Sequence, residues 1–353
     1  MSNRHVTLDA GALTGFMQAL FAASGVREEW SALVADSLVA ANLRGVDSHG
    51  VQLAPFYLAQ LADGRVDAQA AGQVAIEAGA LLSYDGQNGL GQVVASHAVD
   101  HAARLARAHG LGLVVARESN HFGAAAWWAQ RLSSQGLLGV VLCNASTIVP
   151  PWQAKDPVWG TNPICVSPPG GRWLLDMATT TVAMGKIYKA KVNGEAEIPA
   201  GWAMDSEGRP TISTAEALAG LLMPLGGYKG SGLAMMVEIL TGVLAGGAMG
   251  TELGGLRVEG RPFRVSQCFL AIDVARLMPL PEFEARMERL IAMVKSTRPA
   301  AGFDEVLVAG EPEWRREAER RKTGVLVDEP LFCTLTDWAG RLGVAQTPSK
   351  LSL

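Results

Sequence analysis

The residue types best suited to proton chemistry stand in one short segment, residues 42–51, with the sequence NLRGVDSHGV. Its glycines allow tight turns that hold an arginine, an aspartate, a serine and a histidine close together. Of these side chains only His49 changes charge near neutral pH without help, so it is the natural proton donor or acceptor. In the structural alternative, Asp47 and Ser48 cap a helix expected at 52–63, and His49 lies in its solvated first turn.

A second segment suits an anionic ligand. Residues 118–126, ESNHFGAAA, lead from an expected strand into an expected alanine-rich helix. A helix N-terminus offers free N–H groups and partial positive charge, and Gly123 lets a ligand approach the backbone closely. In the structural alternative, Ser119 and Asn120 merely cap that helix.

Three further turns have a related character. Residues 176–180, DMATT, suit a ribose or pyrophosphate, although capping would also explain them. Residues 225–232, LGGYKGSG, hold Lys229 among glycines at a helix start; the alternative is a turn with a solvent-facing lysine, and the Walker spacing is absent. The turn at 160–163, GTNP, presents Thr161 for a hydrogen bond to a substrate carboxylate, although turn chemistry alone would account for it.

Composition narrows the class of protein. The chain has 353 residues, of which 49% are hydrophobic and 18% charged, and its formal net charge is -4. That charge argues against nucleic acid or a membrane surface as partner, so a small-molecule substrate is expected. The mixed charges at 312–322 are typical of a solvated helix face.

The four cysteines are far apart and lack metal-binding spacing, so we expect neither a disulfide framework nor a metal site. The N-terminus lacks the pattern of a secretory signal, and the longest apolar run, 232–249, carries Glu238 at its centre. These features predict a cytoplasmic protein.

Hydrophobic periodicity predicts the elements that position the reactive residues. Helices are expected at 7–23, with Thr7 as N-cap, at 27–43 and at 52–63. After a change of period near residue 73, strands are expected at 74–77, 80–84, 112–117, 138–143, 163–166, 173–176, 268–273 and 306–309, with a helix at 89–109. This order favours an α+β fold with a mixed, mainly antiparallel sheet of about seven strands over a doubly wound parallel sheet.

The elements predict two lobes. A helical N-terminal lobe covers 1–72 and is joined by the C-terminal segment 312–353. A sheet-containing, cofactor-binding domain covers 73–311 and carries a helical insertion at 179–261, with a surface loop at 193–210. No G-x-G-x-x-G follows a strand anywhere in the chain, so the domain is not expected to be a Rossmann fold.

Several segments in register resemble the type-2 malate/L-lactate dehydrogenase family. They are LRGVDSHGV at 43–51, SNHFG at 119–123, GTNP at 160–163, DMATT with AMGK at 176–186, GGYKGSGL at 226–233 and FLAID at 269–273. The resemblance implies reduction of 2-oxo acids or cyclic imino acids with NADH or NADPH as cofactor. It also implies a non-Rossmann, mostly antiparallel sheet and a homodimer with active sites near the subunit interface.

The resemblance assigns roles by position. His49 looks like the general acid that protonates a carbonyl oxygen or imine nitrogen, and Ser48 would orient it. Thr161 falls at an expected substrate contact. The residues at expected cofactor contacts are His121, Phe122, Gly123, Ala124, Ala125, Asp176, Met177, Ala178, Tyr228, Lys229 and Gly310.

The chain departs from the family pattern in three places. Many relatives carry an arginine four residues after the catalytic histidine to hold the substrate carboxylate, and here that residue is Leu53. Carboxylate recognition would then come from Arg44, Lys186 or Thr161, or the substrate differs. Cyclic-imine reductases of the family can carry an aspartate at Lys186, which disfavours an imine substrate. Tyr228 stands where a histidine is commoner.

These observations predict an NAD(P)H-dependent oxidoreductase that interconverts a small 2-oxo acid and its 2-hydroxy acid. A cyclic imino acid reductase, acting on a pyrroline or piperideine 2-carboxylate, is the alternative. A second alternative is a catalytically silent cofactor-binding protein, against which the Ser48-His49 pair and Lys229 argue. A phosphotransferase is disfavoured because no Walker lysine and no cluster of magnesium-binding carboxylates is present.

Overall fold

A seven-stranded sheet forms the centre of the computed structural model, which describes residues 5–256, 260–345 and 347–350. The strand order is β2 (Gln73–Ala78), β3 (Leu81–Asp85), β4 (Leu111–Ser119), β11 (Val265–Asp273), β5 (Leu137–Cys143), β6 (Ile164–Ser167) and β7 (Leu175–Met177). Only β3 and β4 pair in parallel, while every other neighbouring pair in this sheet is antiparallel. The mixed, mainly antiparallel sheet predicted from the sequence is confirmed.

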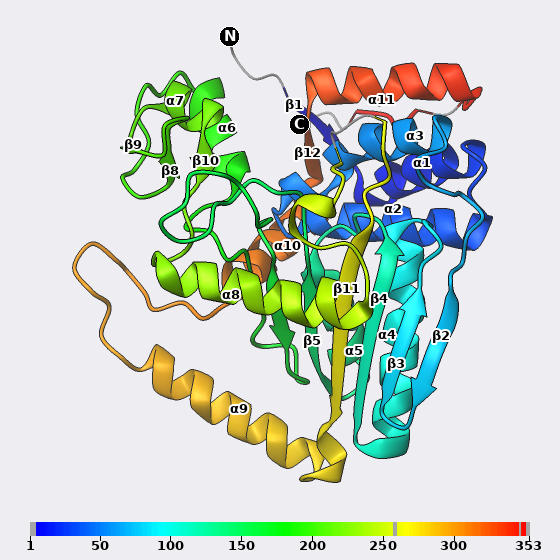
Figure 1. Ribbon diagram of the computed structural model, residues 1–353, viewed down its shortest axis with the longest axis vertical. Coiled ribbons are helices and arrows are strands. Elements are labelled where there is room, and N and C mark those ends of the chain that lie inside the picture. The colour runs from blue at the N-terminus through cyan, green and yellow to red at the C-terminus, as the bar shows by residue number, and fades with distance from the viewer. Residues whose placement is uncertain (1–4, 257–259, 346, 351–353) are drawn as a thin grey trace.

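Helices cover both faces of this sheet (Figure 1). On one face, α4 (Gly91–His109) and α5 (Ala125–Ser133) build the largest buried cluster with the strands. Alanines along α4 allow close packing, and a Cβ at Gly112 of β4 would lie 2.2 Å from the Ala102 carbonyl oxygen, so only glycine fits there. On the other face lies α8 (Tyr228–Glu238), which continues as a π-helix over Ile239–Val243.

A second buried cluster unites both ends of the chain. It contains α1 (Ala10–Ala23), α2 (Glu28–Leu43), α3 (Ala54–Ala62) and α11 (Glu329–Leu342). Strands β1 (His5–Leu8) and β12 (Val325–Asp328) pair antiparallel beside these helices, and α10 (Glu311–Thr323) contacts α2. The expected capping role of Thr7 is wrong because Thr7 lies in β1; the Asp9 side chain caps α1 by accepting from the Ala12 N–H at 2.9 Å.

The segment expected as a helical insertion is only partly helical. It contains α6 (Met184–Val192) and α7 (Thr214–Ala219), but also a three-stranded sheet of β8 (Ala203–Met204), β9 (Pro210–Thr211) and β10 (Leu221–Leu222). A small buried cluster that includes Ile187, Ala203 and Leu222 holds these elements together. Such two-residue strands among glycines and prolines show no recognisable hydrophobic periodicity in the sequence. Residues 257–259 of the expected insertion lie outside the described part.

Two other expectations need correction or extension. Residues 306–309 form no strand; the Ala309 carbonyl accepts one backbone hydrogen bond, from the Leu174 N–H at 3.1 Å.

Helix α9 (Leu280–Lys295) extends away from the sheet and buries none of its residues (Figure 1). Among the described helices, none combines the length and hydropathy needed to cross a membrane.

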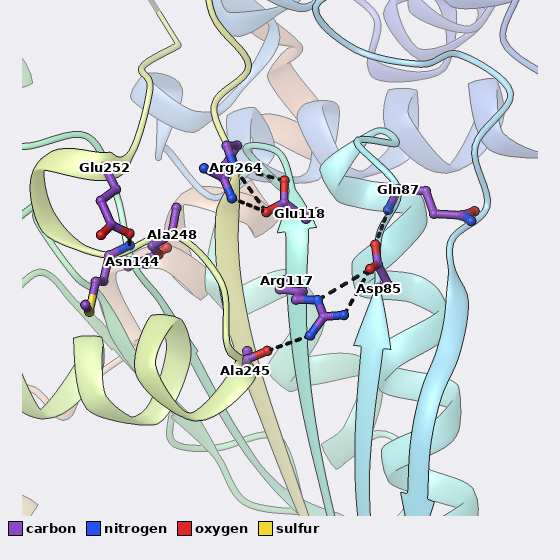
Figure 2. A network of polar contacts seen from close by, with 10 residues as sticks. Asp85, Gln87, Arg117, Glu118, Asn144, Ala245, Ala248, Glu252 and Arg264 are labelled. Carbon is purple, nitrogen blue, oxygen red and sulfur yellow. Dashed lines mark hydrogen bonds and ion pairs between the residues drawn. The ribbon is translucent and has the colours of Figure 1, made fainter.

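Two ion pairs brace the end of β4 where the chain leaves the sheet (Figure 2). Arg117 pairs with Asp85 at 3.2 Å and also donates to the Ala245 carbonyl oxygen, and Arg264 pairs with Glu118 at 2.7 Å. Glu118 and Arg264 both have left-handed backbones, with φ of 47° and 61°. We name Asp85, Arg117, Glu118 and Arg264 the ion-pair bracket; it fixes the strand end from which residues 119–126 depart.

Candidate active site

The segment 42–51 is held by its own side chains and by α10. After α2 ends, Gly45 turns the chain with φ of 76°, and Asp47–His49 form a short 3-10 helix. The Asp47 carboxylate accepts hydrogen bonds from Asn42 at 2.7 Å and from Arg320 at 2.6 and 3.0 Å. It therefore does not cap α3, whose N-cap residue is Leu53, and that structural alternative is wrong for Asp47.

Ser48 and His49 face the expected cofactor segment. The Ser48 hydroxyl lies 3.0 Å from Nδ1 of His49, within hydrogen-bonding distance. The His49 ring stacks on the ring of His121, with centroids 5.8 Å apart and planes 28° apart. The first two predicted motifs are therefore in direct contact.

Small residues lead from His121 into α5. Gly123 has φ of 79° and open space where a Cβ would lie, and Ala124 is the N-cap residue without a capping side chain. Ser119 and Asn120 do not cap α5: Ser119 accepts from Gln267, and the Asn120 amide donates to carbonyl groups of residues 88 and 89. The capping alternative is therefore wrong for this segment. Phe122 is buried beside Trp128 and belongs to the core.

Asp176 connects the next motif to the same place. Its carboxylate accepts a hydrogen bond from the Ala126 N–H at 2.9 Å, so a side chain from β7 satisfies one free N–H group at the start of α5. Met177 ends β7, and Ala178 follows it. Thr179 then donates from its backbone N–H to the Thr161 carbonyl at 2.9 Å, which joins the 160–163 turn to this strand end.

The Thr161 turn is also held from α8. The neighbouring Asn162 has φ of 37° and donates to the buried Glu238 carboxylate at 3.1 Å. Glu238 also accepts from Asn144 at 3.2 Å. This carboxylate, which the sequence placed in the middle of an apolar run, thus positions the turn that carries Thr161.

The glycine-rich segment completes the arrangement. The Leu225 N–H donates to the Thr179 carbonyl at 2.9 Å, and a Cβ at Gly230 would lie 2.7 Å from the same oxygen. Tyr228 and Lys229 start α8 with exposed side chains. We name the site formed by residues 42–50, 119–126, 160–162, 176–180 and 225–230 the motif junction.

Three remaining candidates border this junction. Gly310 has φ of 87° and precedes α10. It lies against Leu174, which stands two residues before Asp176 in the sequence. Lys186 is exposed in the first turn of α6, and a Cβ at the adjacent Gly185 would lie 3.8 Å from the Ser48 Cβ. Leu53 is only 5% exposed and packs in the N-terminal cluster, so the position of the missing arginine has become part of the core.

Arg44 is the least satisfied charged side chain of the junction. It is 7% exposed, and its Nε and Nη1 atoms have no hydrogen-bond partner among the described residues. Burial raises the pKa of both Asp176 and Cys165, and the charge of Arg44 opposes the rise, so the guanidinium lies near these paired residues of β6 and β7. An unpaired buried cation beside a helix N-terminus fits an anionic cofactor.

Burial changes the ionisation of the junction's side chains. It lowers the pKa of His49, and together with the neighbouring His49 charge it lowers the pKa of His121 to about 3. The surrounding protein raises the pKa of Asp176 to about 6, although solvent still reaches this residue. All three side chains keep some contact with solvent, as groups that meet a ligand must.

Tyr57, which joins the site from α3, was not predicted as a site residue. Its hydroxyl lies 2.6 Å from Nδ1 of His121, and the residue is 3% exposed. Eight positions after His49 it reads as one more apolar helix residue, and only the fold shows that it meets the histidines.

Two hollows of about 240 and 360 Å³ lie elsewhere, against α9.

The mixed sheet and the stacked histidines at the start of α5 fit a class of dehydrogenases built without the Rossmann fold. Residues 8–336 match the family model described as malate/L-lactate dehydrogenase. The chain belongs to this family.

Known relatives match over nearly the whole chain. A malate dehydrogenase of Pyrococcus abyssi is 34% identical, and the match covers 98% of this chain and 97% of that protein. The solved structure of sulfolactate dehydrogenase from Methanocaldococcus jannaschii matches with a TM-score of 0.91 and 33% identity, covering 96% of this chain and 98% of that one. The solved delta1-piperideine-2-carboxylate reductase from Pseudomonas syringae matches with a TM-score of 0.83 and 29% identity, covering 94% and 99%.

Proposed function

We propose that this protein is an NAD(P)H-dependent oxidoreductase that interconverts a small 2-oxo acid and its 2-hydroxy acid. The observation that carries the proposal is the His49–His121 stack, which brings a titratable imidazole to the start of α5. The relatives named malate and sulfolactate dehydrogenase support this substrate class. A bound nicotinamide would supply or accept the hydride.

We assign proton transfer to His49. In reduction it donates a proton to the carbonyl oxygen, and in oxidation it removes the proton of the hydroxyl group. Ser48 holds Nδ1 of His49 at 3.0 Å, which leaves Nε2 for the substrate. Because burial lowers the pKa of His49, its neutral form is favoured near pH 7 and is ready to act as a base.

The cofactor is NAD or NADP, and we propose that it lies along the junction. The proposed contacts are His121, Phe122, Gly123, Ala124, Ala125, Asp176, Met177, Ala178, Tyr228, Lys229 and Gly310. Open space over Gly123 and the exposed Lys229 support this path. We add Arg44, because its buried guanidinium lies close enough to Asp176 for its charge to act on that carboxylate.

We propose that Lys186 and Thr161 receive the substrate carboxylate. Gly185 lies against Ser48, which brings the first turn of α6 to the proton-transferring pair. Thr161 is fixed through its backbone to Thr179. This pair would replace the arginine lost at Leu53, with Arg44 as a further candidate for the acid group.

A direct assay tests the proposal. The purified protein is mixed with NADPH or NADH and a panel of 2-oxo acids and cyclic imines, and nicotinamide absorbance is followed. Turnover of 2-oxo acids is expected. Preference for imines would support the second candidate, a cyclic imino acid reductase, which the Pseudomonas syringae structure favours. Cofactor binding with no turnover of any panel member would support the catalytically silent alternative.

We further propose a homodimer. A band of exposed apolar side chains runs along α8 and the turn after it, which is unusual for a free surface. Its members are Met235, Met236, Ile239, Val243, Leu244 and Met249. Light scattering of the wild type should give the dimer mass, and Ile239→Asp should shift it toward the monomer; a monomeric wild type would refute this proposal.

We propose a cytoplasmic location and two lobes, 1–72 with 312–353 and 73–311. The free thiols of Cys143, Cys165 and Cys268 are buried, as expected where thiols stay reduced. The two separate buried clusters support the lobes. Limited proteolysis that released neither lobe as a stable fragment would count against that division.

A further inference from the structure

The two nitrogens of the His121 ring have different surroundings. Nδ1 faces the Tyr57 hydroxyl at 2.6 Å and the backbone N–H of Gly123 at 3.2 Å. A backbone N–H can only donate, so Nδ1 must be the unprotonated nitrogen of the ring. The proton of neutral His121 then sits on Nε2, and the Tyr57 O–H donates to Nδ1.

His49 lacks this constraint. Its Nδ1 faces the Ser48 hydroxyl at 3.0 Å, and a hydroxyl can either donate or accept. Ser48 therefore serves both the neutral and the protonated imidazole. The stacked rings have centroids 5.8 Å apart, so a positive charge on one disfavours a charge on the other.

We propose that Tyr57 is a positioning residue that locks His121 as the neutral Nε2–H tautomer, leaving proton exchange to His49 alone. His121 is then a permanent hydrogen-bond donor toward the bound ligand. The division of roles between the histidines rests on the proposed function; the tautomer does not.

The surroundings of the pair agree with this assignment. Burial lowers the pKa of both rings, and for His121 the charge of His49 adds to the effect. Burial also raises the pKa of Tyr57, and the Cys143 thiol adds to that shift, so the phenol keeps the proton that it donates. Among the titratable groups, His49 thus acts on His121, and Cys143 acts on Tyr57.

Nuclear magnetic resonance of protein with ¹⁵N-labelled histidine tests the tautomer without turnover. His121 signals, assigned with His121→Asn, should show Nε2–H and a bare Nδ1 that do not change between pH 8 and pH 5. In Tyr57→Phe only the longer hydrogen bond from the Gly123 N–H remains on Nδ1, so the ring should populate the Nδ1–H form or titrate within that range. An Nδ1–H tautomer in the wild type would overturn the proposal even if the variant failed to fold.

Tyr84→Phe is the matched control, because this buried tyrosine donates to the Ala71 carbonyl at 2.7 Å on a different part of the sheet. We expect Tyr57→Phe to lower kcat/KM by roughly tenfold, mainly through KM, and to add a second titration to its pH profile. Tyr84→Phe should do neither. Equal kinetic effects in both variants, or an unchanged His121 tautomer in Tyr57→Phe, would overturn the proposal. Absence of any turnover alongside the expected spectra would refute the proposed function and leave the tautomer assignment standing.

Discussion

The ion-pair bracket and the motif junction meet at the end of β4, yet their polar groups are satisfied to very different degrees. In the bracket, the guanidinium groups of Arg117 and Arg264 both face carboxylates (Figure 2). In the junction, Arg44 is more deeply buried than either and keeps two nitrogens without a partner among the described residues. Buried polar groups are normally paired, so the difference separates groups that hold the fold from groups that await a ligand.

Two carboxylates show the same contrast. Glu238 accepts from Asn162, Asn144 and the Gly250 N–H, and it fixes a turn. Within the described part of the chain, the Asp176 carboxylate accepts one hydrogen bond, from the Ala126 N–H, and it stays open to solvent. We infer that Glu238 stabilises the fold, as the ion-pair bracket does. Asp176, like the other groups of the motif junction, is available to a ligand.

The largest effect should follow from His49→Asn, which keeps the size of the side chain but removes its acid-base chemistry. We expect kcat/KM to fall by about 10²- to 10⁴-fold, as for loss of a general acid or base. His97→Asn is the control, since His97 stacks on Tyr84 away from the junction. Steady-state kinetics and thermal unfolding of both variants make the comparison; an activity of His49→Asn within twofold of wild type would remove the proposed role.

Arg44→Met should change binding and stability in opposite directions. Loss of a charged partner for the cofactor should raise its KM by roughly 10- to 100-fold, because hydrogen bonds to charged groups contribute about 1.5–3 kcal/mol. Without cofactor, removal of an unpaired buried charge should leave the protein as stable as wild type or more stable. Arg316→Met, at an exposed ion pair with Glu319, is the control.

The two measurements separate the roles of Arg44. Calorimetric titration with cofactor gives the affinity, and urea unfolding of the free protein gives the stability. A variant that binds cofactor normally but unfolds far more easily would show that Arg44 is structural, and the contrast with the bracket would fail.

The pH dependence of kcat/KM should follow the ionisation of the His49 ring. Its pKa lies below the ordinary value of 6.5 because of burial. Oxidation needs the neutral ring, so its kcat/KM should be level above that lowered pKa and fall about tenfold per pH unit below it. Reduction needs the protonated ring, so its kcat/KM should fall as pH rises through the same pKa.

Rates measured in both directions across pH 5 to 9, with fluorescence to confirm folding, check this expectation. Profiles that rise with pH for reduction would contradict the assignment of His49 as the proton donor. An unchanged profile in His49→Asn would contradict it as well.

The sequence predicted the sheet well because its inner strands β4, β5 and β11 are apolar runs that a buried sheet requires. The four-residue strand β1 was not predicted from the sequence, because it pairs with β12, more than 300 positions further along the chain. A local sequence pattern carries no information about such a distant partner. The His49 and His121 motifs were found because their residue types are chemically distinctive. Tyr57 was missed for the opposite reason, since a tyrosine on a helix looks like core until the fold brings His121 to its hydroxyl.

The smallest effect should come from Glu118→Gln, which weakens the bracket. The Glu118 and Arg264 side chains are 29% and 46% exposed, so solvent screens the pair, and we expect a loss of roughly 0.5–1 kcal/mol in the free energy of unfolding. The neutral amide keeps the shape of the strand end, so kcat/KM should change less than twofold. Glu317→Gln, which breaks an exposed pair with Arg321 inside α10, is the control.

Unfolding measurements at different salt concentrations test the Glu118→Gln prediction further. Raising the ionic strength should shrink the stability difference between wild type and Glu118→Gln, because mobile ions screen exposed pairs. A tenfold fall in kcat/KM at unchanged stability would place Glu118 in the junction. The strand end would then transmit position directly to His121, three residues along the chain, and the bracket and the junction would be one unit.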